Sequence, residues 1–302
     1  MSSPFRLRVV IPHFFRDGAS DSSGGYGSGR HGNRLPRSLA LARCLGNVLS
    51  LNRAPQDWIL NIAERKMEMT PVSNLRGLPG VVIDLHLFVC GDDWLQDVVE
   101  LFAPRLQLHR MELSDPRQLP LEAVRQLLDM SDPGYLSLYL EDDLVIQDQN
   151  YVDKLEWFYQ RTENRFVLMP HRREPTVANA PQQLYVDGPI KDESQIEPLW
   201  ASDEAVVGSG HFWDGQEVEF VKPFNPHSGS FCISADQASI LRSAPWPPPT
   251  FVGPLETAAT GTVLMKFPVL KPAWRHRNFL TLEHGNPSFL SCFNQFPRRD
   301  CL

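Results

Sequence analysis

The sequence predicts an α/β fold in which helices cover both faces of a largely parallel sheet. Three observations support this prediction. Apolar strands alternate with amphipathic helices through the first half of the chain, polar residues stand just after several strands, and the composition is ordinary for a globular protein. The 302 residues are 42% hydrophobic and 22% charged. We therefore expect a single domain over 1–302, with ligands bound beyond the carboxyl ends of its strands.

The first strand is expected over 5–12, an apolar segment that ends at Pro12. A segment rich in glycine and serine, roughly 17–33, follows and predicts a loop. No G-K-[ST] sequence follows these glycines, so the loop is not a phosphate-binding P-loop. Residues 35–51 have helical spacing, with Pro36 in the first turn. The residues expected on the buried face of this helix are Leu35, Leu39, Ala42, Leu45 and Leu49.

The strand and helix pattern continues through the first half of the chain. Strands are predicted over 81–90 and 106–113, and helices near 94–103 and 118–130. The next strand begins at Tyr135 and is the most informative segment of the sequence, because it ends on three consecutive acids.

The second half of the chain has a different character. An amphipathic helix is predicted near 150–161 and a short strand over 165–170. Beyond them the chain is rich in proline and aromatic residues, which predicts longer loops and a few antiparallel strands. No linker or internal repeat divides this half into an independent domain.

The acids after the Tyr135 strand are Glu141, Asp142 and Asp143, and an apolar run over 144–146 follows them. Three adjacent carboxylates repel one another and are costly to desolvate. A buried strand that ends in this way needs a compensating cation, and a hard divalent metal ion is the simplest candidate. The segment therefore predicts a site for a metal-bound phosphate compound.

Composition excludes several other classes of protein. The net charge of −7 and the pI of about 5.7 argue against a nucleic-acid binder, which normally has a basic face. The five cysteines form no C-x-x-C pair, so a zinc ribbon is not expected. Cys44, Cys90 and Cys232 lie in apolar runs and are expected to be buried thiols in a reducing cytoplasm. No run approaches the ~20 apolar residues that a transmembrane helix needs.

Polar residues stand after three of the predicted strands. His13 follows the first strand, Asp92 follows the strand over 81–90, and the acid triplet follows the Tyr135 strand. The carboxyl ends of parallel strands meet at one edge of a sheet, so these side chains are expected to share one crevice.

The sequence E-D-D-L-V-I at 141–146 resembles the metal-binding region of GT-A glycosyltransferases, and is most similar to the E-D-D variant of N-acetylglucosaminyltransferase I. The opening V-V-I-P and the later R-x-L-A-L-x-R-C-L are also similar to the start of family-two-type enzymes, and the order of elements is similar over about 5–290. The resemblance implies a GT-A fold, which is a Rossmann-like mixed sheet between helices. Its nucleotide-binding half is expected over 1–145 and its acceptor-binding half over 146–302. One departure is the long Gly/Ser insertion after the first strand.

The resemblance also implies roles for individual residues. Asp143 is expected to ligate Mn²⁺ or Mg²⁺ directly, and His284 to complete the metal shell or contact the diphosphate. The basic cluster over 271–277 is expected to meet the same diphosphate. A glycine in the turn before F-C-I-S lets the sugar approach the backbone. The residues expected to bind the donor are His13, Arg34, Asp92, Glu141, Asp142 and Gly229.

An inverting transfer needs a carboxylate that takes the proton from the acceptor hydroxyl. Glu256 is the predicted base, because it lies in the first turn of a helix that begins at Gly253-Pro254. A glutamate in that position is often only a partner of the helix dipole. Asp203 and Glu204 are the alternatives. Ser234 is expected to cap the helix that follows the F-C-I strand.

The expected function is a metal-dependent, inverting glycosyltransferase of the hexosyltransferase type. Its expected partners are a nucleotide-sugar donor and a carbohydrate or other hydroxyl acceptor, without nucleic acid and without a transmembrane segment. Two alternatives stay open. A sugar-phosphate nucleotidyltransferase shares the α/β core, and the glycines over 24–30 loosely imitate its loop. A non-catalytic nucleotide- or carbohydrate-binding protein of the same fold would keep the acids without turnover.

Overall fold

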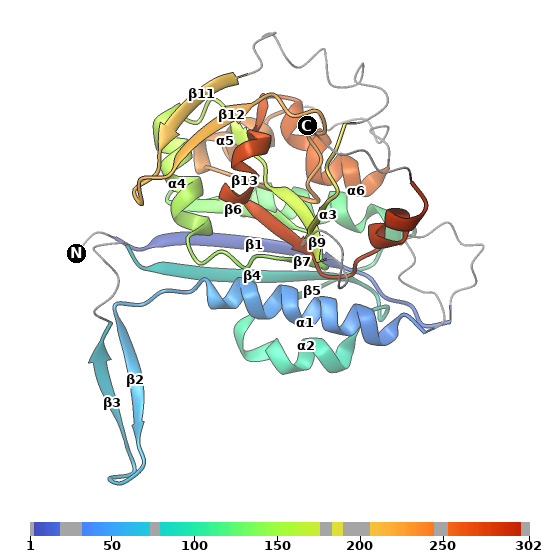
Figure 1. Cartoon of the computed structure of the whole chain (residues 1–302). Coiled ribbons are helices and arrows are strands. Elements are labelled where there is room, and N and C mark those ends of the chain that lie inside the picture. The colour runs from blue at the N-terminus through green and yellow to red at the C-terminus, as the bar shows by residue number, and fades with distance from the viewer. Residues whose placement is uncertain are drawn as a thin grey trace.

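The computed structural model in Figure 1 describes residues 3–18, 32–72, 79–175, 183–189, 206–244 and 253–296. Most of the predicted Gly/Ser-rich loop lies outside the described residues, as do Asp203 and Glu204. The described part is a mixed α/β structure with parallel and antiparallel strands, as the sequence predicts.

The central sheet has five strands in the order β13-β6-β1-β4-β5. The strands β1 (Phe5–His13), β4 (Val81–Cys90), β5 (Gln107–Met111) and β6 (Tyr135–Leu140) are parallel, which confirms the predicted core. The edge strand β13 (Ser230–Ile233) is antiparallel to β6. Because of this topology, the carboxyl ends of β1, β4 and β6 and the amino end of β13 lie along one edge.

Helices cover both faces of this sheet (Figure 1). On one face lie α1 (Arg34–Ser50) and α2 (Gln96–Phe102), which pack with the Val9 and Ile11 side chains of β1. On the other face lies α3 (Leu119–Asp129), which packs with Val10. Successive residues of a strand point to opposite faces, so β1 contributes to two separate apolar clusters.

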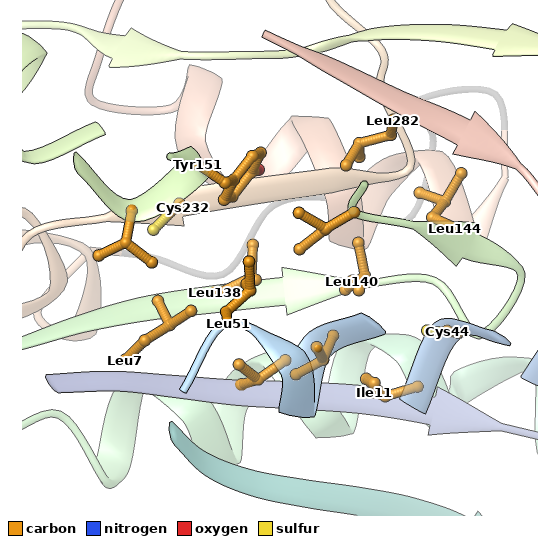
Figure 2. Close-up of a cluster of buried hydrophobic side chains, with 14 of the residues drawn as sticks. Leu7, Ile11, Cys44, Leu51, Leu138, Leu140, Leu144, Tyr151, Cys232 and Leu282 are labelled. Atoms are coloured by element: carbon orange, nitrogen blue, oxygen red, sulfur yellow. The ribbon is translucent and has the colours of Figure 1, made fainter. Parts of the chain in front are cut away.

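The larger cluster joins the two halves of the chain. Figure 2 shows side chains of β1, α1 and β6 next to Tyr151, Cys232 and Leu282 from the second half. Of the described cysteines, Cys44, Cys90 and Cys232 are buried free thiols, as the sequence predicts.

The predicted buried face of α1 is wrong in its first two turns. Leu35 is 68% exposed and Leu39 is 56% exposed. The buried stripe instead begins at a charged residue, Arg37, which the leucine spacing does not reveal. The buried residues of this helix are Arg37, Ala40, Leu41, Cys44, Leu45 and Val48.

The helix α4 (Tyr151–Thr162) opens the second half and matches its prediction. A four-stranded sheet has the order β10-β9-β15-β7. Its strands are β7 (Leu144–Val145), β9 (His171–Pro175), β10 (Gln183–Tyr185) and β15 (Thr281–His284). The pair β9–β15 is parallel, whereas β10–β9 and β15–β7 are antiparallel.

A second four-stranded sheet has the order β11-β12-β14-β8. Its strands are β8 (Val167–Leu168), β11 (Val206–His211), β12 (Glu217–Val221) and β14 (Val269–Pro272). Short 3₁₀ segments connect the larger elements at Ala103–Arg105, Pro116–Gln118, Trp274–Phe279 (η6) and Phe289–Asn294 (η7).

Two predicted helix starts are confirmed. The helix α5 (Ala235–Arg242) begins with a capping box, in which Ser234 and Gln237 satisfy each other's backbone N–H groups. Gly253 precedes α6 (Pro254–Glu256), and the same helical segment continues through a π-helical turn at Thr257–Gly261 and α7 (Thr262–Leu264).

A hairpin made of β2 (Gln56–Asn61) and β3 (Lys66–Pro71) is not anticipated by the sequence analysis. It projects from the body of the molecule (Figure 1). Trp58 pairs with Met69 and Leu60 with Met67, so one side of the hairpin is apolar, and all four side chains are more than half exposed. Within the described part of the chain, no helix is long and apolar enough to cross a membrane.

Candidate functional site

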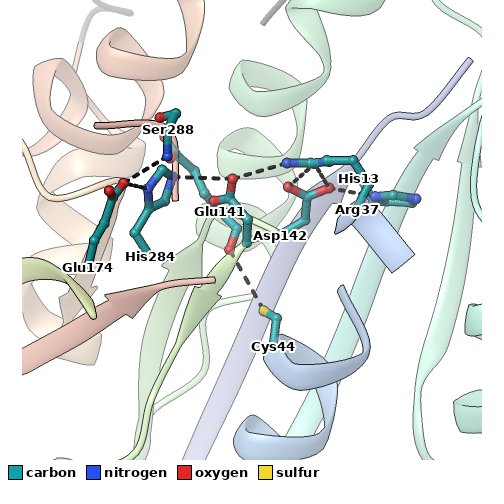
Figure 3. Close-up of polar contacts among 9 residues, drawn as sticks. His13, Arg37, Cys44, Glu141, Asp142, Glu174, His284 and Ser288 are labelled. Carbon is teal, nitrogen blue, oxygen red and sulfur yellow. Dashed lines mark hydrogen bonds and ion pairs between the residues drawn. The ribbon is translucent and has the colours of Figure 1, made fainter. Parts of the chain in front are cut away.

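The acid triplet lies at the carboxyl edge of the central sheet, where segments that are distant in sequence meet (Figure 3). Two backbone hydrogen bonds hold it there. The N–H of Glu141 donates to the carbonyl of Gly229 at 3.0 Å, and the N–H of Gly285 donates to the carbonyl of Asp143 at 2.6 Å. The loops before β13 and after β15 are thereby fixed to the end of β6.

Asp142 is held by a histidine and an arginine. The Nδ1 of His13, at the end of β1, lies 2.5 Å from Asp142 Oδ2, and Arg37 Nη2 lies 2.6 Å from both carboxylate oxygens. The backbone N–H of Leu95 donates to His13 Nε2 at 3.1 Å. Because Nε2 accepts this bond, Nδ1 carries the proton that His13 donates to Asp142.

Asp143 lies between Arg37 and His284. Its Oδ2 accepts from Arg37 Nη1 at 3.0 Å and is 3.4 Å from His284 Nε2. Burial by itself raises the pKa of Asp143. The hydrogen bond from His284 and the charge of Arg37 outweigh burial and hold this pKa at about 2. Asp143 is therefore an ionised carboxylate over the whole physiological range.

Glu174 orients His284 from the other side of the ring. Its fully buried carboxylate accepts from His284 Nδ1 at 2.6 Å and from the three backbone N–H groups of residues 288–290. Burial by itself lowers the pKa of His284. The contacts with Asp143 and Glu174 have a larger, opposite effect, and the resulting pKa is about 9. At neutral pH the ring is an imidazolium that donates from both nitrogens.

Sequence reasoning missed Arg37, the cation shared by Asp142 and Asp143. Burial lowers the pKa of Arg37, and the two carboxylates raise it above its ordinary value. The predicted residue, Arg34, lies about one turn earlier, is 48% exposed and pairs with Asp97 at 2.9 Å. The signal that identifies Arg37 is the stripe of buried residues at 40, 41, 44 and 45, which leads back to position 37.

Glu141 differs from its neighbours in its protonation. The pKa of this half-buried carboxyl is raised to about 8. Burial is the main cause, and the charges of Asp143 and Glu256 raise the pKa as well, whereas the charge of Arg172 lowers it. The predicted base Glu256 is thus close enough to Glu141 to act on its titration.

Gly229 lies against Glu141. A Cβ on this glycine would be 2.6 Å from Glu141 Oε2, and its φ of +60° is a left-handed conformation. The close approach that the sequence analysis assigned to a sugar is made here by the protein's own carboxylate. The left-handed backbone favours glycine, and the side chains of Glu141 and Leu144 occupy the space that a Cβ would need.

A buried ionic network lies behind Glu141 and was also missed. Asp187 accepts from Arg172 Nε at 3.0 Å and from Lys271 Nζ at 3.1 Å. Burial raises the pKa of Asp187, but Lys271 and Arg172 hold it at about 2, whereas burial lowers the pKa of Lys271 to about 8. Lys271 was predicted to meet a diphosphate, but it is fully buried and bonded to Asp187.

Asp92 is paired at the surface rather than with these groups. Its side chain is 94% exposed and pairs with Arg110 at 3.4 Å. Of the predicted residues, the structure therefore brings together His13, Glu141, Asp142, Asp143, Gly229, Glu256 and His284, whereas Arg34 and Asp92 make separate surface ion pairs.

The predicted Mn²⁺ or Mg²⁺ does not fit the side chains as they are arranged. Asp142 and Asp143 share one cation, Arg37, and His284 pairs with both Asp143 and Glu174. A metal ligand must offer a lone pair, so an ion at His284 would have to displace a proton from the ring. Across the described ranges, no three His, Cys, Asp or Glu side chains are grouped so that they could hold a metal ion.

No protein-family model matches this chain, and no curated protein sequence matches it. Solved structures with some likeness include two of S. aureus TarS. The first, of its residues 1–349, has a TM-score of 0.44 at 11% identity and aligns 88% of this chain with 57% of that one. The other has a TM-score of 0.41 at 10% identity and aligns 88% with 35%.

A third structure, of 4-diphosphocytidyl-2C-methyl-D-erythritol synthase, has a TM-score of 0.35 at 10% identity, and the alignment covers 91% of this chain and 92% of that one. With TM-scores below 0.5, these likenesses do not assign the chain to a family.

Proposed function

We propose that this protein is a glycosyltransferase of the GT-A type, which moves a sugar from a nucleotide-sugar donor to a hydroxyl acceptor with inversion. The observation that carries the proposal is convergence at the sheet edge. His13, the acid triplet, Gly229 and His284 were predicted from four separate segments and are linked by contacts, and the charge of Glu256, from a fifth segment, acts on Glu141. The carboxyl edge of parallel strands is the usual ligand site of such sheets.

The proposed chemistry rests on Glu256, whose charge acts on the neighbouring Glu141. The acceptor oxygen forms a bond to the anomeric carbon while the bond to the donor phosphate breaks, and that electron pair leaves with the nucleotide diphosphate. The acceptor proton passes to Glu256. Burial raises the pKa of Glu141 to about 8, so this neighbouring carboxyl keeps its own proton near neutral pH. No step uses the predicted metal, because its expected ligands are already paired.

One observation favours a second candidate, a non-catalytic nucleotide- or carbohydrate-binding protein. Arg37 pairs with both Asp142 and Asp143, the two residues predicted to meet the donor or its metal. A protein of this kind would bind nucleotide through the same crevice without breaking the glycosidic bond.

The test is release of nucleotide from a panel of UDP-, GDP-, CDP- and dTDP-sugars, with and without acceptor sugars and Mn²⁺. For the active donor, Glu256→Gln is expected to lower turnover at least about 100-fold. Glu217→Gln is the matched control, because Glu217 is exposed at the start of β12.

Three outcomes oppose the proposal. Undiminished turnover in Glu256→Gln removes the assigned base. Pyrophosphate release from a nucleoside triphosphate and a sugar phosphate makes the protein a nucleotidyltransferase. Tight nucleotide binding without turnover across the panel makes it a binding protein.

A further inference from the structure

A concave site lies away from the acid cluster. Its cavity has a volume of about 810 Å³ and is bordered by β9, β10, β15, η6 and the loop before α4. Along β9, Arg173 lines this cavity, whereas the next residue, Glu174, bonds to His284. Along β15, Thr281 lines the cavity, whereas His284, three positions later, lies on the other face of the strand. Successive strand residues face opposite sides, so the cavity and the acid cluster occupy opposite faces of this sheet.

Two arginines that line the cavity, Arg173 and Arg277, are held in place by uncharged groups. Arg173 donates to the amide oxygens of Gln183 at 2.5 Å and Gln147 at 2.8 Å, which fix the guanidinium but carry no charge. Arg277 donates to the carbonyl of Trp274 at 3.0 Å, and its buried Nε has no hydrogen-bond partner in the described structure. Among the described residues, neither arginine forms an ion pair with a carboxylate.

The remaining charges of the cavity cancel. Lys154 Nζ lies 2.6 Å from Asp148 Oδ2, so this pair leaves no net charge. The lining therefore carries the positive charge of two guanidinium groups, in contrast to Arg37 with its two aspartates. A guanidinium that is held in place and faces a cavity suits a carboxylate, because it offers parallel N–H donors.

Aromatic rings form the wall beside these arginines. Trp274 is 52% exposed, and its ring meets the Tyr185 ring at a centroid distance of 5.3 Å and an angle of 69°. The guanidinium carbon of Arg277 lies 5.1 Å from the Tyr185 ring and 5.4 Å from the Trp274 ring. Exposed aromatic faces of this kind pack against the C–H faces of sugars.

Neutral hydrogen-bonding groups complete the lining. The side chains of Gln147, Gln183, Asn278 and Thr281 border the same cavity. Amides and hydroxyls that both donate and accept match the hydroxyl groups of a sugar ring. A nucleobase would need fewer such groups, and a simple inorganic anion would need no aromatic wall.

We propose that this cavity binds an acidic saccharide, with a sugar carboxylate on Arg173 and Arg277 and a sugar face on Trp274. The site is separate from the proposed reaction centre, so it does not depend on the proposed function. Its location fits a saccharide that extends across the face of the β10-β9-β15-β7 sheet.

Trigalacturonate is the probe, and binding to the full chain is measured by calorimetry at low ionic strength, with maltotriose as the neutral counterpart. Trigalacturonate is expected to bind and maltotriose to bind at least about tenfold more weakly. Trp274→Ala and Arg277→Gln are each expected to weaken trigalacturonate at least about tenfold. Trp213→Ala and Arg105→Gln are matched controls, because both side chains are exposed and neither lines the cavity.

The proposal is overturned if trigalacturonate does not bind, if maltotriose binds equally well, or if the controls weaken binding as much as the cavity variants. Tighter binding of UMP that is lost in Trp274→Ala makes the cavity a nucleotide site instead. Where Arg277→Gln fails to fold, Arg173→Gln replaces it, because Arg173 bonds only to two glutamine side chains in the described structure. Binding is read without turnover, so this result and that of the transferase assay are independent.

Discussion

Replacing Arg37 with methionine is predicted to destabilise the fold by about 3–5 kcal/mol, because it leaves two buried carboxylates without their cation. The side chains of Arg37, Asp142 and Asp143 are only 10%, 11% and 13% exposed. Solvent therefore cannot replace the lost charge. For a chain of 302 residues, this free energy corresponds to a fall in melting temperature of about 5–8 °C.

The measurement is thermal and urea unfolding of Arg37→Met at neutral pH. Arg34→Met is the matched control, because Arg34 is on the same helix but 48% exposed, and its effect is expected within about 0.5 kcal/mol. Adding Asp142→Asn and Asp143→Asn to Arg37→Met should restore much of the stability, since no uncompensated charge remains. This recovery separates the loss of charge from the loss of packing.

The same variant tests the metal. With Arg37 removed, Asp142 and Asp143 are free to accept a cation, so Mn²⁺ should raise the melting temperature of Arg37→Met more than that of the wild type. The reasoning is refuted if Arg37→Met melts with the wild type, or if the added asparagines restore nothing. A large Mn²⁺ shift in the wild type would contradict the conclusion that pairing with Arg37 keeps the two aspartates from binding a metal ion.

The remaining predictions concern the fold around the site. The pKa of Asp187 is about 2 in the folded state, below its ordinary value, so its stabilisation, about 2 kcal/mol, is present above pH 4 and is lost as the pH falls through 2. In urea unfolding at a series of pH values, Asp187→Asn should reduce the loss of stability at low pH. If the free energy of unfolding falls with pH as in the wild type, Asp187 is not the cause of that loss. Gly229→Ala should cost about 1–3 kcal/mol more than Gly134→Ala, which has a positive φ but no neighbour within 4 Å. Adding Glu141→Ala should recover the steric part, and equal losses in the two glycine variants would contradict the clash. Ser234→Ala should cost about 1 kcal/mol in chemical denaturation through loss of the capping box, and a neutral effect would contradict that role.

The central sheet could be predicted because its strands are buried on both faces and alternate with helices. The hairpin over 56–71 could not. Its turn holds Arg65 in a left-handed conformation, with φ of 52°, where a glycine or asparagine normally signals the turn. Its strands are exposed on both sides, so burial imposes no clear pattern on their sequence.

The position of the site could be predicted from the types of residue at the strand ends. The balance of charges within the site could not. The acid triplet correctly indicated that a cation must lie nearby. Arg37 supplies that charge from a position more than 100 residues away, on a helix where the leucine spacing pointed to another face. Glu174 and the Asp187 network have no sequence motif either, because their partners come together only in the folded chain.

The β2–β3 hairpin has a consequence for how the protein behaves in solution. A two-stranded ribbon without a supporting layer is held mainly by its own cross-strand pairs, so its amide hydrogens should exchange well before those of the central sheet. Met67 and Met69 are 55% and 53% exposed on its apolar side. Oxidation of these two thioethers to sulfoxides would make that side polar and leave the rest of the molecule intact.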